Sequence, residues 1–137
     1  MPAQPIIVWF RQDLRLADNP ALVQAAAADA PVIPLYVLDD RTQGQWGIRG
    51  AARWWLHRSL QSLDASLRDL GSSLLLRHGD AGQVIPRLVE ETGARAVYWN
   101  RCYEPRVIAR DSRIKESLGA TGMEAKSFNA ALLFEPW

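Results

Sequence analysis

Polar residues that could bind a ligand or take part in a reaction follow three apolar runs of this 137-residue chain, each at the point where the run ends. Arg11 follows the first run, Asp39 the second, and Asn100 with Arg101 a later one. Such runs are typical of strands buried in a parallel sheet, and ligands meet these sheets at the carboxyl ends of the strands. The sequence therefore predicts a cleft with apolar walls and a few polar anchors. A planar aromatic cofactor with a polar edge suits such a cleft, although these residues alone do not specify the occupant.

The sequence offers little support for hydrolytic, metal or phosphate chemistry. It contains no GxSxG or HExxH motif, and its two histidines have no nucleophile or metal partner close in sequence. Cys102 is a lone thiol that we expect to be inert. The glycine-spaced segment 44–50 matches neither GxGxxG nor GxxxxGK[ST], so it predicts a flexible turn in preference to a phosphate cradle.

Apolar runs alternate with helical patterns along the whole chain. We expect strands at residues 6–10, 32–39, 73–79, 96–100 and 123–129, and helices at 20–29, 51–70, 80–93 and 106–118. The short connections predict a single α/β domain, a Rossmann-like doubly wound five-stranded parallel sheet with helices on both faces. The last strand alternates apolar and polar residues, which predicts an edge position.

Capping residues and apolar stripes set the predicted helix boundaries. Asn19 is the expected N-cap of the first helix, with Leu22 and Val23 facing inward. Asp80 and Gly93 are expected to begin and end the third helix, in which Pro86 should either start the regular part or kink it. The second helix is expected to end at Gly71 and to bury a stripe of leucines at positions 56, 60, 63, 67 and 70.

Composition and charge set the broad class of protein. Hydrophobic residues make up 48% and charged residues 23%, which is typical of a globular domain, and the net charge of +1 gives no electrostatic argument for nucleic acid or membrane as a partner of this chain. A single cysteine, the absence of a signal-peptide pattern at the start and the lack of an apolar run near 20 residues lead us to expect a cytoplasmic location.

Several motifs, spread in order along the chain, resemble the DNA photolyase and cryptochrome family. The first is Val-Trp-Phe-Arg-Gln-Asp-Leu-Arg at residues 8–15, followed by Asp-Asn-Pro-Ala-Leu at 18–22. The resemblance continues through Arg-Trp-Trp-Leu at 53–56, Trp-Asn at 99–100, Tyr-Glu-Pro at 103–105, Ser-Phe-Asn at 127–129 and Glu-Pro-Trp at 135–137. These motifs are most similar to the plant-cryptochrome-like branch, which includes related bacterial photolyases.

The resemblance implies that residues 1–137 form the N-terminal α/β domain of a longer protein. A C-terminal helical domain, absent from this chain, would bind FAD and UV-damaged DNA, and light-excited reduced FAD would split pyrimidine dimers by electron transfer. The α/β domain would hold a light-harvesting antenna chromophore (a folate, a deazaflavin or a flavin). The implied contacts are Arg11, Asp39, Ile48, Ala52, Asn100 and Arg101, with no catalytic residue and no metal in this chain.

Departures from the family pattern leave the chromophore open. Cys102 stands near the position where deazaflavin-type members have an acidic residue, and Arg106 and Val107 stand where folate-type members have polar and acidic groups. Two other functions also remain: a cryptochrome-type blue-light photoreceptor, or a stand-alone nucleotide-binding module. The module would need a phosphate loop after the first strand, which residues 11–14 do not provide. Asp13 and Arg15 are expected to shape that loop, since opposite charges this close usually pair and cap.

Overall fold

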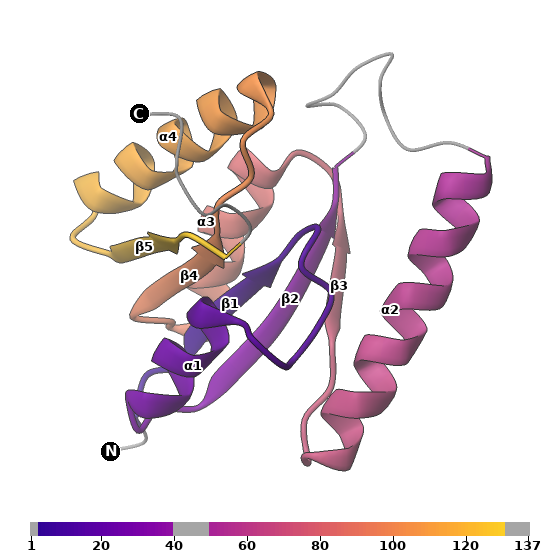
Figure 1. Cartoon of the computed structure of the whole chain (residues 1–137). Helices are drawn as coiled ribbons and strands as arrows, with labels where there is room; N and C mark the ends of the chain where they lie inside the picture. The colour runs from indigo at the N-terminus through magenta and orange to yellow at the C-terminus, as the bar shows by residue number, and fades with distance from the viewer. Residues whose placement is uncertain (1–2, 40–49, 131–137) are drawn as a thin grey trace.

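The computed structural model describes residues 3–39 and 50–130. In these residues five parallel strands form one sheet in the order β3-β2-β1-β4-β5 (Figure 1). The strands are β1 (Ile6–Phe10), β2 (Val32–Leu38), β3 (Leu75–His78), β4 (Ala96–Asn100) and β5 (Glu124–Phe128). The helices are α1 (Pro20–Ala27), α2 (Ala51–Asp69), α3 (Ala81–Thr92) and α4 (Pro105–Ala120). The predicted α/β fold and the edge position of the last strand are confirmed.

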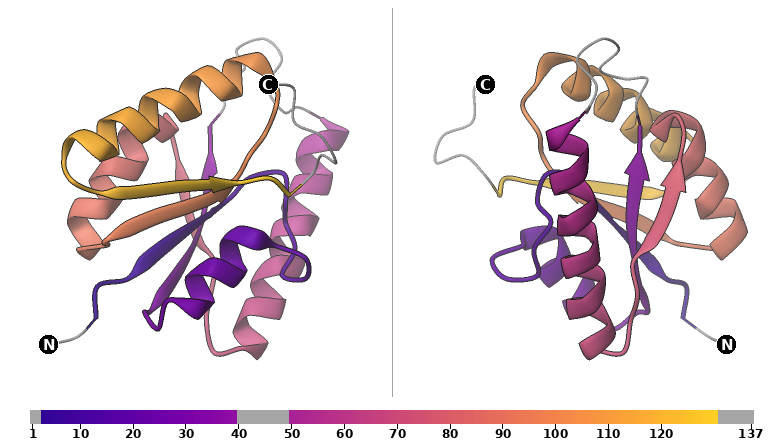
Figure 2. Two further views of the ribbon diagram at one scale, coloured as in Figure 1. Left: turned by 60° about the vertical axis from the view of Figure 1, so that its left-hand side comes forward. Right: turned by 90° about the vertical axis from the view of Figure 1, so that its right-hand side faces the viewer.

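The central strand β1 divides the core into two layers. Ile7 and Trp9 pack with α3 and α4 on one face, and Val8 and Phe10 pack with α1 and α2 on the other. Figure 2 shows these two pairs of helices on opposite sides of the sheet. All five residues of β1 are buried, which is why the strand is apolar without alternation. In this strand order the chain runs from β1 outward to β2 and β3 and then returns to β4 on the other side of β1, so the topological switch point lies between β1 and β4. Folds of this kind bind ligands at the carboxyl ends of the strands near that point.

The predicted helix caps form. Asn19 Oδ1 accepts a hydrogen bond of 3.1 Å from the backbone N–H of Leu22 at the start of α1. Asp80 Oδ1 accepts a bond of 2.9 Å from the Gly82 N–H at the start of α3. Gly93 ends α3 in the left-handed conformation, with φ +68°. These bonds satisfy helix-end groups that would otherwise lack partners.

The end of α2 differs from the predicted leucine stripe. Leu63 and Leu67 are buried, but Leu70 is 73% exposed. The helix ends at Asp69, and Gly71 then turns the chain with φ +80° while its N–H donates to the Arg68 carbonyl. The prediction for Leu70 is wrong: the helix ends one residue earlier, Leu70 is its C-cap, and Leu67 is the last leucine of α2 that is buried.

Two further expectations, for Val23 and Pro86, are changed by the structure, and the one for Val23 is wrong. Val23 is 59% exposed, because Ala21 and Ala25 face the sheet and place it on the outer side of α1, while Leu22 is half-buried. Small side chains at the buried positions suit a helix that lies close to the strands. Of the two alternatives for Pro86, a helix start is excluded because α3 begins five residues earlier, and a kink at this internal proline stays a prediction.

Asp64 connects α2 to the segment before β3, and this contact predicts a pH dependence. Its Oδ1 accepts a 2.9 Å bond from the Leu74 N–H and its Oδ2 a 2.8 Å bond from Arg68 Nε. The Leu74 bond first and Arg68 second lower the pKa of Asp64 below its ordinary value of 3.8. A lowered pKa stabilises the fold above the unfolded-state pKa, and this stability disappears as the pH falls through the folded-state pKa. We therefore expect Asp64→Asn to be less stable than wild type at neutral pH, with the difference vanishing in strong acid.

Urea unfolding at pH 7 and at about pH 2.5 measures this difference. Asp69→Asn, the same change at an exposed carboxylate near the end of α2, is the control and should have little effect at either pH. If the loss of stability in Asp64→Asn were the same at both pH values, the ionised Asp64 carboxylate would not be its cause.

Candidate functional site

A cavity of about 280 Å³ opens at the carboxyl ends of β1 and β2. Trp9 and Arg11 contribute from β1 and its exit loop, and Tyr36 and Asp39 from β2 and its end. Further side chains from α2, α4 and the loop after β4 complete the walls. The strand ends thus converge as the sequence predicts, and we call this space the carboxyl-end cavity.

The residues selected from the sequence fall in three places. Arg11 and Asp39 line the carboxyl-end cavity. Asn100 and Arg101 line a neighbouring cavity of about 210 Å³, and Cys102 lines both. Ala52 is exposed in the first turn of α2 and is not among the residues that line the carboxyl-end cavity. Leu56, one turn further along the helix, does line it. The remaining one, Ile48, lies outside the described residues.

Arg11 is a buried cation with unused hydrogen-bond donors. The residue is 8% exposed, and its Nη2 lies 2.7 Å from Asp111 Oδ2. That contact pairs the charges without hydrogen-bond geometry, so within the described residues Nε, Nη1 and Nη2 of Arg11 have no hydrogen-bond partner. The same is true of the buried Trp9 Nε1. Buried donors are nearly always satisfied in folded proteins, so these enclosed groups in the wall of the carboxyl-end cavity are exceptional.

An aromatic and ionic cluster forms the wall beside Arg11. The guanidinium carbons of Arg11 and Arg110 lie 4.6 and 4.8 Å from the Trp9 ring centre. Arg110 also lies 3.1 Å from Asp111 and 3.6 Å from Asp39, so two cations and two carboxylates balance each other. Asp39 accepts a further bond from the N–H of the first residue of α3. Together these contacts fix the charged groups around the Trp9 ring.

Sequence reasoning did not select Arg110 or Asp111. Asp111 occupies an apolar-stripe position of α4 with Val107, Ile114 and Leu118, and all four residues are buried. A carboxylate in a stripe with steps of four, three and four requires a buried partner. That spacing is the sequence signal that could have identified Asp111, although it does not name Arg11 as the partner.

A network of amide and carboxylate groups, which we call the polar clasp, comprises Asp13, Asn19 and Asn100. Asn100 Nδ2 donates to Asp13 Oδ2 and, at 2.7 Å, to Asn19 Oδ1. Asn100 Oδ1 accepts a 3.1 Å bond from the Ala21 N–H. Asp13 Oδ1 also accepts a 2.8 Å bond from the Arg11 N–H. The clasp joins the β1 exit loop, the start of α1 and the end of β4, and so sets the position of Arg11.

Two other arginines fix the surrounding backbone. Arg15 Nη2 donates to the Asp18 carbonyl at 3.0 Å, and Arg101 donates to Ser127 Oγ and to the Ser127 carbonyl, both at 3.1 Å. Asp13 and Arg15 have the predicted structural role in the loop, but their side chains bond to different partners and not to each other in the way the prediction assumed. Arg101 connects the end of β4 to the end of β5, beside the cavity that it lines.

The arrangement suits binding better than bond chemistry. Among residues 3–39 and 50–130, no cluster of three or more histidine, cysteine, aspartate or glutamate side chains could hold a metal ion. No helix in the same ranges is long and apolar enough to span a membrane. A cavity with an aromatic wall at the carboxyl ends of a parallel sheet is typical of α/β domains that bind planar ligands.

Comparison with known proteins identifies the family to which this domain belongs. The sequence matches the DNA photolyase family model over residues 6–137, and the chain belongs to that family. It is 46% identical to the deoxyribodipyrimidine photo-lyase of Agrobacterium fabrum and 45% identical to Cryptochrome-1 of Arabidopsis thaliana, each over 132 residues. Both matches cover 96% of this chain, but only 27% and 19% of the two relatives.

Solved structures show the same relationship. A bacterial class III photolyase from Agrobacterium tumefaciens is similar with a TM-score of 0.91 and 44% identity, covering 99% of this chain and 28% of that one. An archaeal photolyase from Sulfolobus tokodaii, solved with two FAD molecules, has a TM-score of 0.86 and 33% identity, covering 96% and 31%. The chain therefore has the fold of the photolyase N-terminal domain and spans less than a third of the length of these relatives.

Proposed function

We propose that this chain is the N-terminal light-harvesting domain of a deoxyribodipyrimidine photolyase, with an antenna chromophore in the carboxyl-end cavity. The full-length protein would repair UV-induced pyrimidine dimers by electron transfer from FAD in a C-terminal helical domain. A bound antenna would absorb light and pass excitation to that FAD, and this domain's residues would bind and orient it. The observation that carries the proposal is the buried Arg11, whose guanidinium lies against the Trp9 ring in the wall of the carboxyl-end cavity.

Arg11 and Asp39 are the proposed direct contacts, since both line the carboxyl-end cavity. Arg11 would donate to acceptors on the chromophore's polar edge, beside the Trp9 ring. Asn100 and Arg101 would border the chromophore from the neighbouring cavity, and Ile48 and Ala52 remain proposed contacts from the sequence. The two FAD molecules of the Sulfolobus tokodaii photolyase support a flavin as the occupant, in preference to a folate or a deazaflavin.

A cryptochrome-type photoreceptor is the second candidate. The identity to Cryptochrome-1 of Arabidopsis thaliana is 45%, against 46% for the Agrobacterium fabrum photo-lyase. This difference is too small to separate repair from signalling. Light-dependent dimer repair by the full-length protein separates the two, because a photoreceptor that signals only through partners would leave the dimers intact.

The absorption spectrum of the full-length protein, purified from its own host, tests whether an antenna chromophore is bound. We expect a band beyond those of FAD, and we expect Arg11→Gln to lose that band while the FAD bands remain. Arg58→Gln, on the exposed face of α2, is the matched control and should keep the full spectrum. A wild-type spectrum without any additional band would overturn the antenna proposal.

The 137-residue chain alone is expected not to split pyrimidine dimers under light, because the proposed electron donor is bound by the helical domain. We also expect it to bind damaged DNA weakly, since its net charge is +1. Chromatographic quantitation of dimers after blue-light illumination measures the first property, with full-length protein as the positive control. Measurable repair by the chain alone would show that the reaction does not require the helical domain.

A further inference from the structure

Large apolar side chains are exposed mainly on one side of the described domain. Five such residues are exposed among residues 3–39 and 50–130, and one of them is Val23 on α1. The other four belong to α2, to β3 or to the turn between them: Trp54, Trp55, Leu70 and Leu76. The opposite edge strand, β5, instead presents an ion pair of Glu124 and Lys126 at 2.8 Å. Charged side chains discourage contacts at a sheet edge, whereas grouped apolar ones favour an interaction surface.

Two adjacent tryptophans dominate this side of the domain. Trp54 is 53% exposed and Trp55 is 64% exposed, although tryptophan is largely buried in most folded proteins. Their ring centres lie 5.0 Å apart with an angle of 79° between the planes, which is an edge-to-face contact. This contact holds the two indoles in one arrangement. We call the surface formed by Trp54 and Trp55 the α2 aromatic face.

The N-terminal half of α2, which carries the aromatic face, is not covered by the rest of the described domain. None of residues 51–62 is buried, whereas Leu63 and Leu67 in the C-terminal half are. In Figure 1 this N-terminal half stands clear of the strands. Helices in proteins draw most of their stability from the packing of one face, and about three turns gain little from helix propensity alone. The uncovered half of α2 therefore favours a partner that packs against it.

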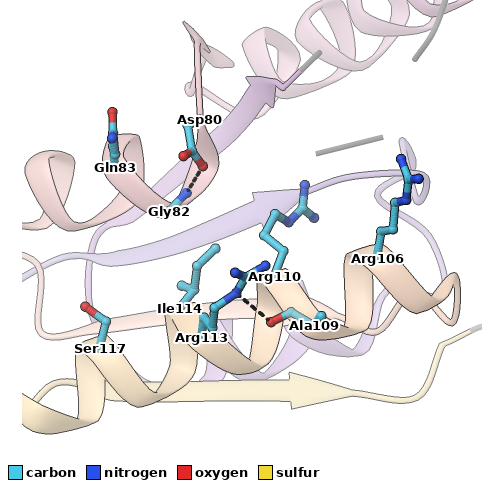
Figure 3. Close-up of a pocket in the computed structure, with 9 residues that line it drawn as sticks. All are labelled: Asp80, Gly82, Gln83, Arg106, Ala109, Arg110, Arg113, Ile114 and Ser117. Carbon is cyan, nitrogen blue, oxygen red and sulfur yellow. Dashed lines mark hydrogen bonds between the residues drawn. The ribbon is translucent and has the colours of Figure 1, made fainter. Parts of the chain in front are cut away.

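The α3 and α4 layer, on the other face of the sheet, has a different surface. A hollow of about 590 Å³ lies between α4 and the start of α3, and Figure 3 shows arginines and other polar side chains along it. Ile114, which also lines this hollow, is 2% exposed and belongs to the buried core. This layer therefore remains in water without exposing large apolar side chains, and it provides the control for the experiment below.

The remainder of the full-length protein is the partner that suits the aromatic face. The chain covers 27% of the Agrobacterium fabrum photo-lyase and 28% of the solved Agrobacterium tumefaciens photolyase, so more than two thirds of each relative lies outside the match. In the proposed function, a helical domain in that additional chain receives excitation from the carboxyl-end cavity. Efficient transfer favours a helical domain close to this cavity. The N-terminal half of α2 reaches the same place, since Leu56 lines the cavity.

We propose that Trp54 and Trp55 dock the C-terminal helical domain of the full-length protein onto this domain. The inference rests on the proposed function, because the helical domain is part of it. The occupant is an apolar surface of that domain, which would cover both indoles and the N-terminal half of α2. Large aromatic side chains with few rotatable bonds lose little entropy on binding, and tryptophans commonly contribute most of the energy of an interface.

Hydrogen–deuterium exchange of the 137-residue chain and of the full-length protein tests the docking. We expect the amides of residues 51–62 to exchange at least about tenfold more slowly in the full-length protein, because the docked domain must first open. Residues 113–120 of α4 are the control and should exchange alike in both proteins. Equal exchange of residues 51–62 in the two proteins would overturn the proposal.

The double variant Trp54→Ser/Trp55→Ser identifies the side chains responsible. Serine and tryptophan have similar helix propensities, so the 137-residue chain should unfold at the same urea concentration with or without the change. In the full-length protein, the protection of residues 51–62 should fall to the level of the 137-residue chain. Val23→Ser, a change of an exposed apolar residue on α1, is the matched control and should keep the protection. Protection that survives in the double variant would overturn the role of the tryptophans.

Light scattering separates the helical domain from a second copy of the chain as the occupant. We expect the double variant to leave the oligomeric state unchanged in both proteins. A wild-type dimer that the double variant converts to a monomer would overturn the proposal, since a second copy would then cover the indoles. The antenna and the repair reaction are decided by the absorption spectrum and the dimer assay. Protected residues 51–62 in a protein without an antenna band would therefore contradict the antenna proposal and leave the docking intact.

Discussion

Asp111→Asn is expected to lower the free energy of unfolding by about 3 kcal/mol. Asp111 is buried between two cations, with Arg11 at 2.7 Å and Arg110 at 3.1 Å. Asparagine has nearly the same volume, so the substitution removes the charge and preserves the packing. Asp39, at 3.6 Å from Arg110, would be left to balance both guanidinium groups. The expected loss is at the lower end for a broken buried ion pair because that second carboxylate remains.

Urea unfolding followed by tryptophan fluorescence measures the loss, since Trp9 lies within the cluster. Glu116→Gln changes an exposed carboxylate of the same helix and should alter stability by no more than about 0.5 kcal/mol. If the two variants unfold at the same urea concentration, Asp111 does not hold the buried charges together. The loss at Asp111 should also weaken chromophore binding, because Arg11 would no longer be fixed beside the Trp9 ring.

Asn100→Asp should destabilise the chain by at least about 3 kcal/mol, and more than Asn100→Ala, for which we expect about 2 kcal/mol. The amide of Asn100 is 3% exposed and donates to both Asp13 and Asn19. An ionised aspartate keeps the acceptor for the Ala21 N–H but can donate neither bond. It would also place a second carboxylate against Asp13 without a compensating cation.

The order of the two Asn100 variants is the informative result, and urea unfolding at neutral pH measures it. Gln24→Glu introduces the same change of amide to acid on the exposed side of α1 and should be nearly neutral. If Asn100→Ala were the less stable of the two variants, lost packing would explain the effect, and the donated bonds of the polar clasp would not.

Features that depend on a few adjacent residues are predictable from this sequence. Asn19, Asp80 and Gly93 mark helix ends, because a side-chain acceptor or a left-handed residue meets a local backbone need. The continuous apolar run of β1 likewise indicates a strand covered on both faces. Arg11 and Asp39 line one cavity for the same reason, since the ends of parallel strands meet at one edge of a sheet. Asn100 and Arg101, expected in the same cleft, line the neighbouring cavity instead.

Features that depend on distant contacts are not predictable in this way. The orientation of α1 is set by the close approach of Ala21 and Ala25 to the sheet, so the more hydrophobic Val23 is left exposed. The ion pair of Arg11 and Asp111 joins residues about a hundred positions apart, and the sequence around either residue does not indicate the other as its partner.

The place of β1 in the sheet also affects how the chain is made. Ile7 pairs with Ile33 on one side but with Val97 on the other, so one edge of the central strand has no neighbour until about 90 further residues have been synthesised. At roughly 5–20 residues per second, that interval lasts about 5–18 seconds on the ribosome. Throughout it, the most apolar strand of the domain presents an open hydrogen-bonding edge, which is a hazard for aggregation. Slow decoding before β4 would therefore be expected to reduce the yield of folded protein.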